Sequence, residues 1–208
     1  VFSGWGGVGY CFRERGYQGI GGNEWDPDDK TQNAFKNLAH FFKDMHERKV
    51  LLNKDIWKIT RDELETIMST YGLKPGDLDV FQLSPVCTGF SGKNRNKKRL
   101  MEPDMIDRDD NVINLFKPAI NMVKILLPKF VLLENVSMLC DKISFPKLLE
   151  IKKALEDAGY YVKWRVMKAS DIGAPQLRPR LWMIAVRQDL GVMPTFPDAM
   201  RTKVGVRD

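Results

Sequence analysis

The chain opens on the glycine-rich stretch VFSGWGGVG, residues 1–9. Apolar residues precede the glycines, and a helical pattern follows them from Val8 to Arg15, with Gly16 at its end. Glycines between a strand and a helix let the backbone come close to a bound cofactor. Taken alone this is a weak signal, because such a turn can also serve a phosphate, a dinucleotide or no ligand.

An acidic residue strengthens the signal of the glycine turn. Glu24 stands at the end of the next predicted strand, where a carboxylate is suited to accept hydrogen bonds from ribose hydroxyls. The turn and the acid together indicate an adenosine-containing cofactor. Trp25 could stack on an adenine ring or lie in the core, and Asp55 could accept from an adenine amino group or cap a helix.

Apolar runs of strand length alternate with helical patterns along the chain, which is typical of an α/β fold. We predict a Rossmann-like fold with a mostly parallel sheet and helices on both faces. Beyond the glycine turn, the predicted strands cover residues 17–24, 50–52, 78–83, 129–133, 160–167 and 181–186. The predicted helices cover residues 28–48, 60–72, 111–127 and 145–158, and the second begins with a capping box.

Length and composition predict one domain over residues 1–208, since 43% of the residues are apolar and 29% are charged. The apolar pair Val1–Phe2 lies directly before the glycines, where a first strand would end and not begin. Residues 193–208 carry no pattern that would mark the end of a domain. We therefore expect a domain truncated at both ends. Every apolar run is too short to span a bilayer, so we expect a soluble protein that is not secreted.

The formal net charge of +6 favours a polyanionic partner, although charge alone is weak evidence. Residues 84–109 form a long predicted loop, and long loops of compact domains are often functional. The spacing of the three cysteines fits neither a zinc site nor a disulfide framework. The basic residues concentrated in the loop are Lys93, Arg95, Lys97, Lys98 and Arg99.

Two further residues place chemistry at one edge of the predicted sheet. Cys87 follows the fourth strand and Glu134 ends the fifth, so both lie at the carboxyl ends of strands, where open α/β folds bind ligands. An activated cysteine there can be a nucleophile, although a cysteine is often only a small buried side chain. A carboxyl group that emerges from an apolar strand is partly removed from water and can hold a proton.

A pair of arginines precedes the last predicted strand. Alternation places Arg178 and Arg180 on the same side of the chain, toward either the crevice or solvent. Surface arginines are common. Beside the crevice, however, such a pair could bind a carbonyl oxygen, a phosphate or a buried carboxylate.

In order along the chain, these segments resemble the motifs of the DNA cytosine-5 methyltransferases. The resemblance extends from Phe2 to about Val186, and its specificity lies in the ordered set of motifs. The matching segments are FSGWGG (2–7), NEWD (23–26), PVCTGFS (85–91), ENV (134–136) and QLRPR (176–180).

The resemblance implies an S-adenosylmethionine-dependent methyltransferase fold and a covalent mechanism. In this family a cysteine thiolate adds to C6 of cytosine so that C5 can accept a methyl group, and Cys87 matches that cysteine. By similarity, Glu134 contacts N3 and the exocyclic amine, while Arg180, with Arg178, holds the O2 side of the base. The target base has to be flipped out of the duplex.

The resemblance also implies the cofactor contacts. The implied contacts are Phe2, Gly4, Gly6 and Gly7 for the methionine end, Glu24 for the ribose, and Trp25, Asp55 and Ile56 for the adenine.

Two residues beside Cys87 depart from the family. Val86 stands where most members have proline before the cysteine, and Thr88 replaces a frequent glutamine.

The family places a target-recognition region and two further motifs after the last strand, so the resemblance implies a catalytic fragment. We expect a monomer without metal or membrane, acting on double-stranded DNA, cytoplasmic in a bacterial or phage context and nuclear in a eukaryote. Restriction-modification and orphan roles stay open. The alternatives are a methyltransferase for transfer RNA and a noncatalytic nucleic-acid-binding module. A third alternative, a nicotinamide-dependent oxidoreductase, predicts a glycine spacing that differs from this one and leaves Cys87 and Glu134 unexplained.

Overall fold

The computed structural model describes residues 3–4, 6–26, 30–86 and 112–200. The first part of the chain forms α1 (Gly7–Arg13), β1 (Gly22–Asn23), α2 (Asn33–Phe41), α3 (Lys43–Glu47) and β2 (Leu51–Leu52). β1 and β2 pair in parallel as a two-stranded sheet. A small core lies between α2, α3 and β2 and consists of Leu38, Phe42, Met45, Val50 and Leu51.

The helix predicted over residues 28–48 is two helices in the structure. Phe42, with φ −122° and ψ 57°, interrupts the helical backbone between α2 and α3. Its side chain is buried in the small core, so tertiary packing accompanies the break. The predicted strand over residues 17–24 is also shorter in the structure, because only Gly22 and Asn23 pair with β2.

The predicted capping box is confirmed. Helix α4 (Arg61–Thr70) begins after Thr60, whose side chain accepts from the Glu63 amide while Glu63 accepts from the Thr60 amide. Lys54 holds the same Glu63 carboxylate at 2.8 Å. A short 3-10 helix, η1 (Ile56–Lys58), precedes α4.

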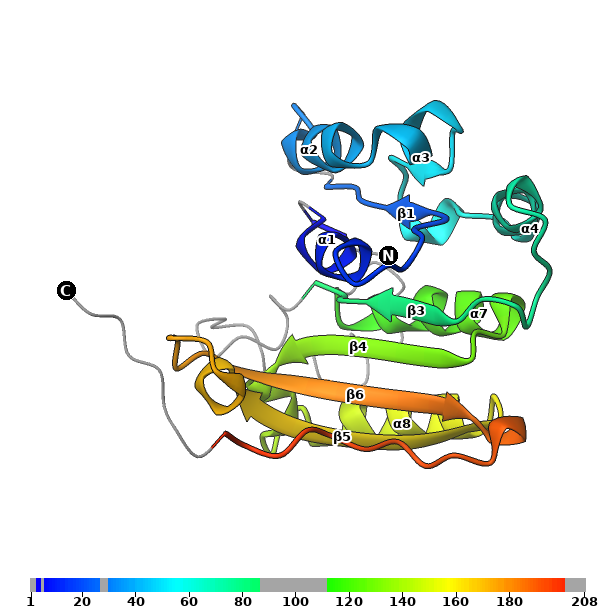
Figure 1. The fold of residues 1–208 in the computed structure, drawn as a ribbon. Coiled ribbons are helices and arrows are strands. Elements are labelled where there is room, and N and C mark those ends of the chain that lie inside the picture. Colours follow the sequence, from blue (N-terminus) through cyan, green and yellow to red (C-terminus); the bar gives the residue numbers. More distant parts are fainter. Residues whose placement is uncertain (1–2, 5, 27–29, 87–111, 201–208) are drawn as a thin grey trace.

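The larger sheet has four strands in the order β3-β4-β6-β5 (Figure 1). β3 and β4 are parallel, but β6 lies between β4 and β5 and is antiparallel to both. β3, β4 and β5 therefore run in one direction and β6 is the reversed strand among these four, so the predicted α/β fold is confirmed, and the described sheet is mixed and not wholly parallel. The chain returns from β5 to β6 through residues 169–178, too few for the crossover that a parallel neighbour requires. The strands are β3 (Val80–Leu83), β4 (Phe130–Val136), β5 (Tyr160–Lys168) and β6 (Pro179–Arg187).

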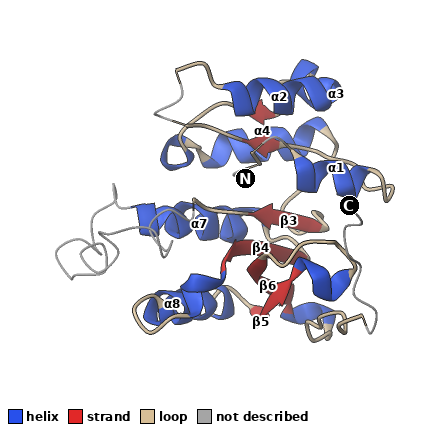
Figure 2. Cartoon of the chain, turned by 90° about the vertical axis from the view of Figure 1, so that its left-hand side faces the viewer, coloured by secondary structure: helices blue, strands red, loops and turns tan. Residues whose placement is uncertain are grey.

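Two helices pack against the larger sheet and complete the main core. Figure 2 shows α7 (Phe116–Leu126) and α8 (Phe145–Glu156) on one side of the strands and α1 on the other. The remaining 3-10 helices are η3 (Val112–Leu115), η4 (Ser137–Cys140), η5 (Ala169–Ile172) and η6 (Gln188–Leu190). In the described parts of the chain, no helix is both long enough and apolar enough to cross a membrane.

Candidate active site and cofactor site

The larger sheet brings three of the predicted motifs to one edge. β3 and β4 are parallel, so Pro85 after β3 and Glu134 near the end of β4 lie toward the same edge. β6 is antiparallel to β4, which places its beginning at that edge and Arg180 opposite Val136. Cys87, two residues after Pro85, lies outside the described residues.

Glu134 and Arg180 form an ion pair at this edge. Nε of Arg180 lies 2.8 Å from Oε1 of Glu134, and the two side chains are 19% and 25% exposed. The contact orients the carboxyl group and neutralises its charge where water is partly excluded. Of the three targets expected for the arginines, the structure shows a carboxylate for Arg180.

Arg178 does not take part in the Glu134–Arg180 ion pair. It precedes the first residue of β6, its side chain is exposed, and its carbonyl oxygen accepts from the Ala169 amide at 3.3 Å. Among the described residues, its guanidinium forms no ion pair. The two arginines therefore have different surroundings, although alternation along the strand predicted a common side.

A buried asparagine connects the Cys87 motif to β4. Asn135 is 1% exposed, and its Nδ2 donates to the carbonyl oxygen of Pro85 at 3.0 Å. Its Oδ1 accepts from the Val136 amide at 2.9 Å. Pro85 is itself buried, while Val86, which stands where the family has proline, is exposed. Sequence analysis quoted Asn135 only as part of a motif; a polar residue at a core-facing position of an apolar strand was the available signal.

The glycine turn is bonded to the acid that follows β1. The Gly4 amide donates to Oε2 of Glu24 at 2.5 Å, and the Ser3 amide donates to the Asn23 carbonyl at 3.0 Å. Burial raises the pKa of Glu24 above its ordinary value, and the bond from Gly4 lowers it by less. The structure thus joins two predicted cofactor contacts that are distant in sequence.

The predicted cofactor glycines Gly4, Gly6 and Gly7 have different requirements. Gly4 and Gly6 have φ of 55° and 86°, values that side chains rarely allow. A Cβ on Gly6 would also lie 2.8 Å from Cε2 of Phe42. At Gly7 the backbone is helical, and a Cβ there would meet nothing within 4 Å. Packing explains Gly6, whereas Gly7 borders open space that a ligand can occupy.

The predicted adenine contacts Trp25, Asp55 and Ile56 differ in exposure and in bonding. Oδ1 of Asp55 accepts from the Trp57 amide at 3.1 Å, so this carboxylate caps η1, the alternative weighed from the sequence. Ile56 is 5% exposed and belongs to the main core, so its side chain is directed away from solvent. Trp25 is 38% exposed beside Glu24 and presents an accessible indole ring. Phe2 lies outside the described residues.

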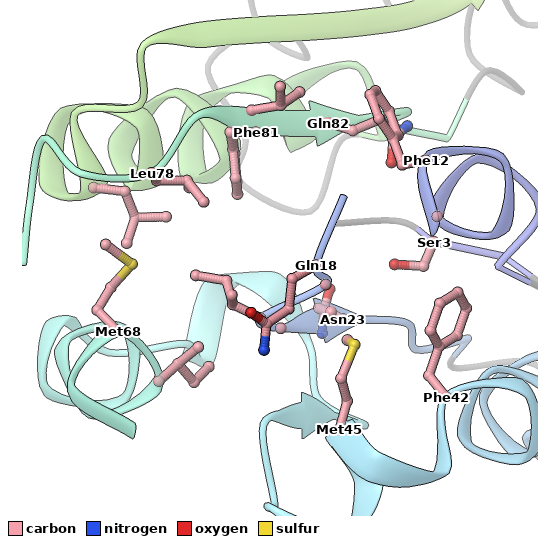
Figure 3. A pocket seen from close by; sticks show the side chains of 18 of the residues that line it. Ser3, Phe12, Gln18, Asn23, Phe42, Met45, Met68, Leu78, Phe81 and Gln82 are labelled. Carbon is pink, nitrogen blue, oxygen red and sulfur yellow. The ribbon is translucent and has the colours of Figure 1, made fainter. Parts of the chain in front are cut away.

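One cavity of the described chain borders the glycine turn, because Ser3 and Gly6 belong to its lining. It has a volume of about 400 Å³ and lies between β1 and β3, as Figure 3 shows. Within the described ranges, its lining includes none of Glu24, Asp55, Glu134 and Arg180. The cavity thus touches the glycine turn through Gly6 but contains neither the Glu134–Arg180 ion pair nor the carboxylate of Glu24. The same ranges contain no cluster of three or more side chains suited to a metal ion.

An α/β fold with a glycine turn bonded to the acid after the next strand defines the class of Rossmann-like proteins that bind adenosine-containing cofactors. Comparison with known families is more specific. The C-5 cytosine-specific DNA methylase model matches residues 1–204. The chain belongs to this family, whose members use S-adenosylmethionine.

Individual relatives agree with the family. The chain is 30% identical over 136 residues to the type II methyltransferase M.MthTI of Methanothermobacter thermautotrophicus, covering 65% of this chain and 39% of the relative. It is 29% identical over 208 residues to M.XorII of Xanthomonas oryzae, covering 99% and 44%. The chain thus spans less than half the length of these relatives.

Solved structures share the fold. A DNA modification methyltransferase encoded within an Escherichia coli prophage superposes with a TM-score of 0.70 at 22% identity, covering 98% of this chain and 51% of that one. The S. pombe Dnmt2 methyltransferase superposes with a TM-score of 0.58 at 20% identity, covering 89% and 49%.

Proposed function

We propose that residues 1–208 are a partial catalytic domain that transfers a methyl group from S-adenosylmethionine to C5 of cytosine in double-stranded DNA, with Cys87 as the nucleophile. The observation that supports this most is the convergence at one sheet edge of the Glu134–Arg180 ion pair and the Asn135–Pro85 bond. The first presents a carboxyl group to a base, and the second holds the segment that leads to Cys87.

The proposed reaction begins with the Cys87 thiolate. Its sulfur forms a bond to C6 of cytosine, and the electron pair of the C5–C6 double bond makes C5 nucleophilic. Glu134 contacts N3 and the exocyclic amine and stabilises the charge that develops on the ring, while Arg180 serves the O2 side. Once C5 is methylated, loss of the C5 proton restores the double bond and expels the Cys87 sulfur.

Arg180 has two tasks in this proposal. In the structure it binds Oε1 of Glu134 through Nε, so it fixes the carboxyl group before a base is present. Its Nη1 donates to the Pro179 carbonyl at 2.9 Å, which further restrains the guanidinium. Preorganised charges of this kind need little rearrangement when the reaction occurs. Arg178, which is exposed, is assigned to the outer part of the same site.

The residues around the glycine turn fit the cofactor. S-adenosylmethionine, when bound, would supply a methyl group on a positively charged sulfur, and that sulfur would keep the bonding pair and leave as the neutral thioether of S-adenosylhomocysteine. Glu24 offers a half-buried carboxylate for ribose hydroxyls, and Gly7 borders open space. Trp25 offers an exposed ring for adenine. Phe2, Gly4, Gly6, Asp55 and Ile56 complete the proposed surroundings, with Gly6 and Ile56 contributing backbone only.

A paired glycine substitution separates cofactor contact from packing. We expect Gly6→Ala to destabilise the fold by about 1–2 kcal/mol, because of its positive φ and the close approach of Phe42. Gly7→Ala should leave the urea midpoint nearly unchanged and weaken S-adenosylmethionine binding in calorimetry. Equal binding by Gly7→Ala and the unchanged chain would remove Gly7 from the proposed site.

The titration of Glu24 gives a pH-dependent prediction. Its pKa is raised above the ordinary 4.5 by burial, so its contribution to stability is present at low pH and is lost as the pH rises through the raised value. Glu24→Gln should remove this loss in urea denaturation measured across that range. Glu63 is the matched control, because Lys54 lowers its pKa and its contribution is lost as the pH falls. If the free energy of unfolding of Glu24→Gln changed with pH in parallel with that of the unchanged chain, this account would be contradicted.

DNA binding is assigned to the basic residues after Cys87 together with the net charge of +6. Lysine and arginine contacts to phosphates give affinity that depends on salt but not on sequence. The cluster of Lys93, Arg95, Lys97, Lys98 and Arg99 lies outside the described residues.

The test is covalent trapping. The chain, extended to the length of its relatives, is incubated with S-adenosylmethionine and DNA that contains 5-fluorocytosine, which blocks the last elimination step. We expect a denaturant-resistant adduct that is absent in Cys87→Ser. No adduct despite measurable cofactor binding would overturn the proposal, and an adduct with transfer RNA in place of DNA would change the substrate.

A further inference from the structure

The connection between β5 and β6 projects at the edge of the sheet that carries the candidate active site. In Figure 1 it lies at the end of the sheet toward which the arrows of β3 and β4 point. Its residues 175–179 are all exposed, and Arg180, which pairs with Glu134, follows them directly. A side chain that this connection presents to solvent is therefore close to the Glu134–Arg180 ion pair.

The most exposed large apolar side chain of the described residues belongs to this connection. Leu177 is 72% exposed, whereas the next in order, Val192, is 55% exposed. Single apolar side chains are common on protein surfaces, so exposure by itself decides little. The position of Leu177 is more informative, because it stands directly before the exposed Arg178 and three residues before Arg180.

Hydrogen bonds fix the backbone on both sides of Leu177. The Gln176 carbonyl accepts from the Ser170 amide at 2.9 Å, and the Arg178 carbonyl accepts from the Ala169 amide at 3.3 Å. Both bonds tie the connection back to η5. The backbone is thus held at the two neighbours of Leu177, while the side chain of Leu177 extends into solvent.

Two prolines and a second segment stiffen the same connection. Pro175 and Pro179 stand at the ends of its exposed part, where each ring fixes its own φ and restricts the residue before it. The preceding η5 is held by Met200, whose amide donates to the Asp171 carbonyl at 2.7 Å. A side chain on so stiff a support costs little backbone ordering when a partner covers it.

The chemistry of this tip suits a DNA duplex from which a base has been removed. Flipping a base costs stacking and pairing energy, and proteins that open base steps insert apolar side chains such as leucine between them. Arg178 adds a positive charge beside Leu177, and among the described residues it forms no ion pair. A duplex presents bases and phosphates side by side, so an apolar tip next to a cation can contact both.

We propose that Leu177 is a wedge that packs against the DNA where the target cytosine leaves the stack, and that it stabilises the flipped-out state. Arg178 binds a neighbouring phosphate. Leu177 acts on the base stack, whereas Glu134 and Arg180 act on the cytosine itself. The inference rests on the proposed methyl transfer to cytosine in double-stranded DNA.

The experiment compares a paired target with an unpaired one. Bisulfite sequencing of DNA methylated by the full-length protein gives the target sequence. Two duplexes then carry 5-fluorocytosine at the target position, opposite guanine in one and opposite an abasic site in the other. We expect Leu177→Ala to slow trapping of the paired duplex by about tenfold, because most of the burial of one leucine side chain is lost. Trapping of the unpaired duplex should change by less than about twofold, because that base is flipped at little cost.

Two variants serve as controls. Leu177→Met keeps an apolar side chain of similar volume and should trap the paired duplex nearly as fast as the unchanged protein. Leu149→Ala removes a leucine that is 46% exposed on α8 and should change neither rate. Melting temperatures of the Leu177 variants should equal that of the unchanged protein, because the side chain contributes little to the core.

Two results would overturn the inference and leave the methyl transfer intact. The first is equal slowing of both duplexes by Leu177→Ala, which would indicate a role in the reaction or in a contact within the protein. The second is unchanged trapping of the paired duplex. If the full-length protein methylates no DNA in the first step, the proposed function itself fails, and the wedge fails with it.

Discussion

Glu134→Gln is expected to slow adduct formation with 5-fluorocytosine DNA by about a hundredfold to a thousandfold, the usual effect of losing a preorganised electrostatic contact. The amide has nearly the same shape, but it has no charge to pair with Arg180 across 2.8 Å, and it has no acidic proton to give to N3 as negative charge develops on the ring. Single-turnover trapping in the full-length protein measures this step directly.

The ion pair makes a second measurement possible. Because Arg180 and Glu134 are in contact, the effects of Glu134→Gln and Arg180→Gln should not add, and the double variant should be little slower than the worse single variant. The control is Glu65→Gln, which breaks the exposed Arg61–Glu65 pair on α4 and should leave the rate unchanged. Additive effects at Glu134 and Arg180 would show that the two side chains act independently.

Asn135→Leu is expected to damage both stability and the proposed chemistry. Leucine has a similar volume but leaves the Pro85 carbonyl and the Val136 amide without their side-chain partner in a buried position. An unsatisfied buried polar group costs about 1–3 kcal/mol. The segment that leads to Cys87 also loses its tether, and a displacement of about 1 Å at a reacting group can cost about a hundredfold in rate.

Two readouts distinguish these effects. Urea denaturation gives the loss of stability, and trapping well below the unfolding transition gives the rate of the folded protein. Asn37→Ala is the matched control, because the Asn37 side chain donates to the Asn33 carbonyl one turn earlier on α2, a bond that is exposed to solvent. If Asn135→Leu loses stability but traps DNA at the normal rate, Asn135 supports the core and does not position the Cys87 segment.

Local signals predicted much of the fold. The capping box begins α4 where Thr60 and Glu63 indicated, and Gly159, with φ 90°, follows α8 as expected. The direction of β6 was missed, because apolar periodicity shows which residues are buried and not which neighbour a strand has. The break at Phe42 was missed for a related reason, since helical spacing continues across it.

For the candidate site, too, the sequence predicted the residues but not the contacts between them. Residue types and their order along the chain determined the family, confirmed over residues 1–204, and selected Glu24, Glu134 and Arg180. The contacts among them could not be read from the order. That Gly4 bonds Glu24, Arg180 bonds Glu134 and Asn135 holds Pro85 depends on long-range packing.

By itself, the sequence determined the periodic elements, the helix caps and the set of chemical groups, because these depend on neighbours a few residues away. Only the tertiary structure decided strand order, the partner of each charged group and the empty space between β1 and β3. The physical reason is distance along the chain. Strand pairing and close packing join residues tens of positions apart, and no local pattern records which of the available partners a buried polar group or a strand edge will have.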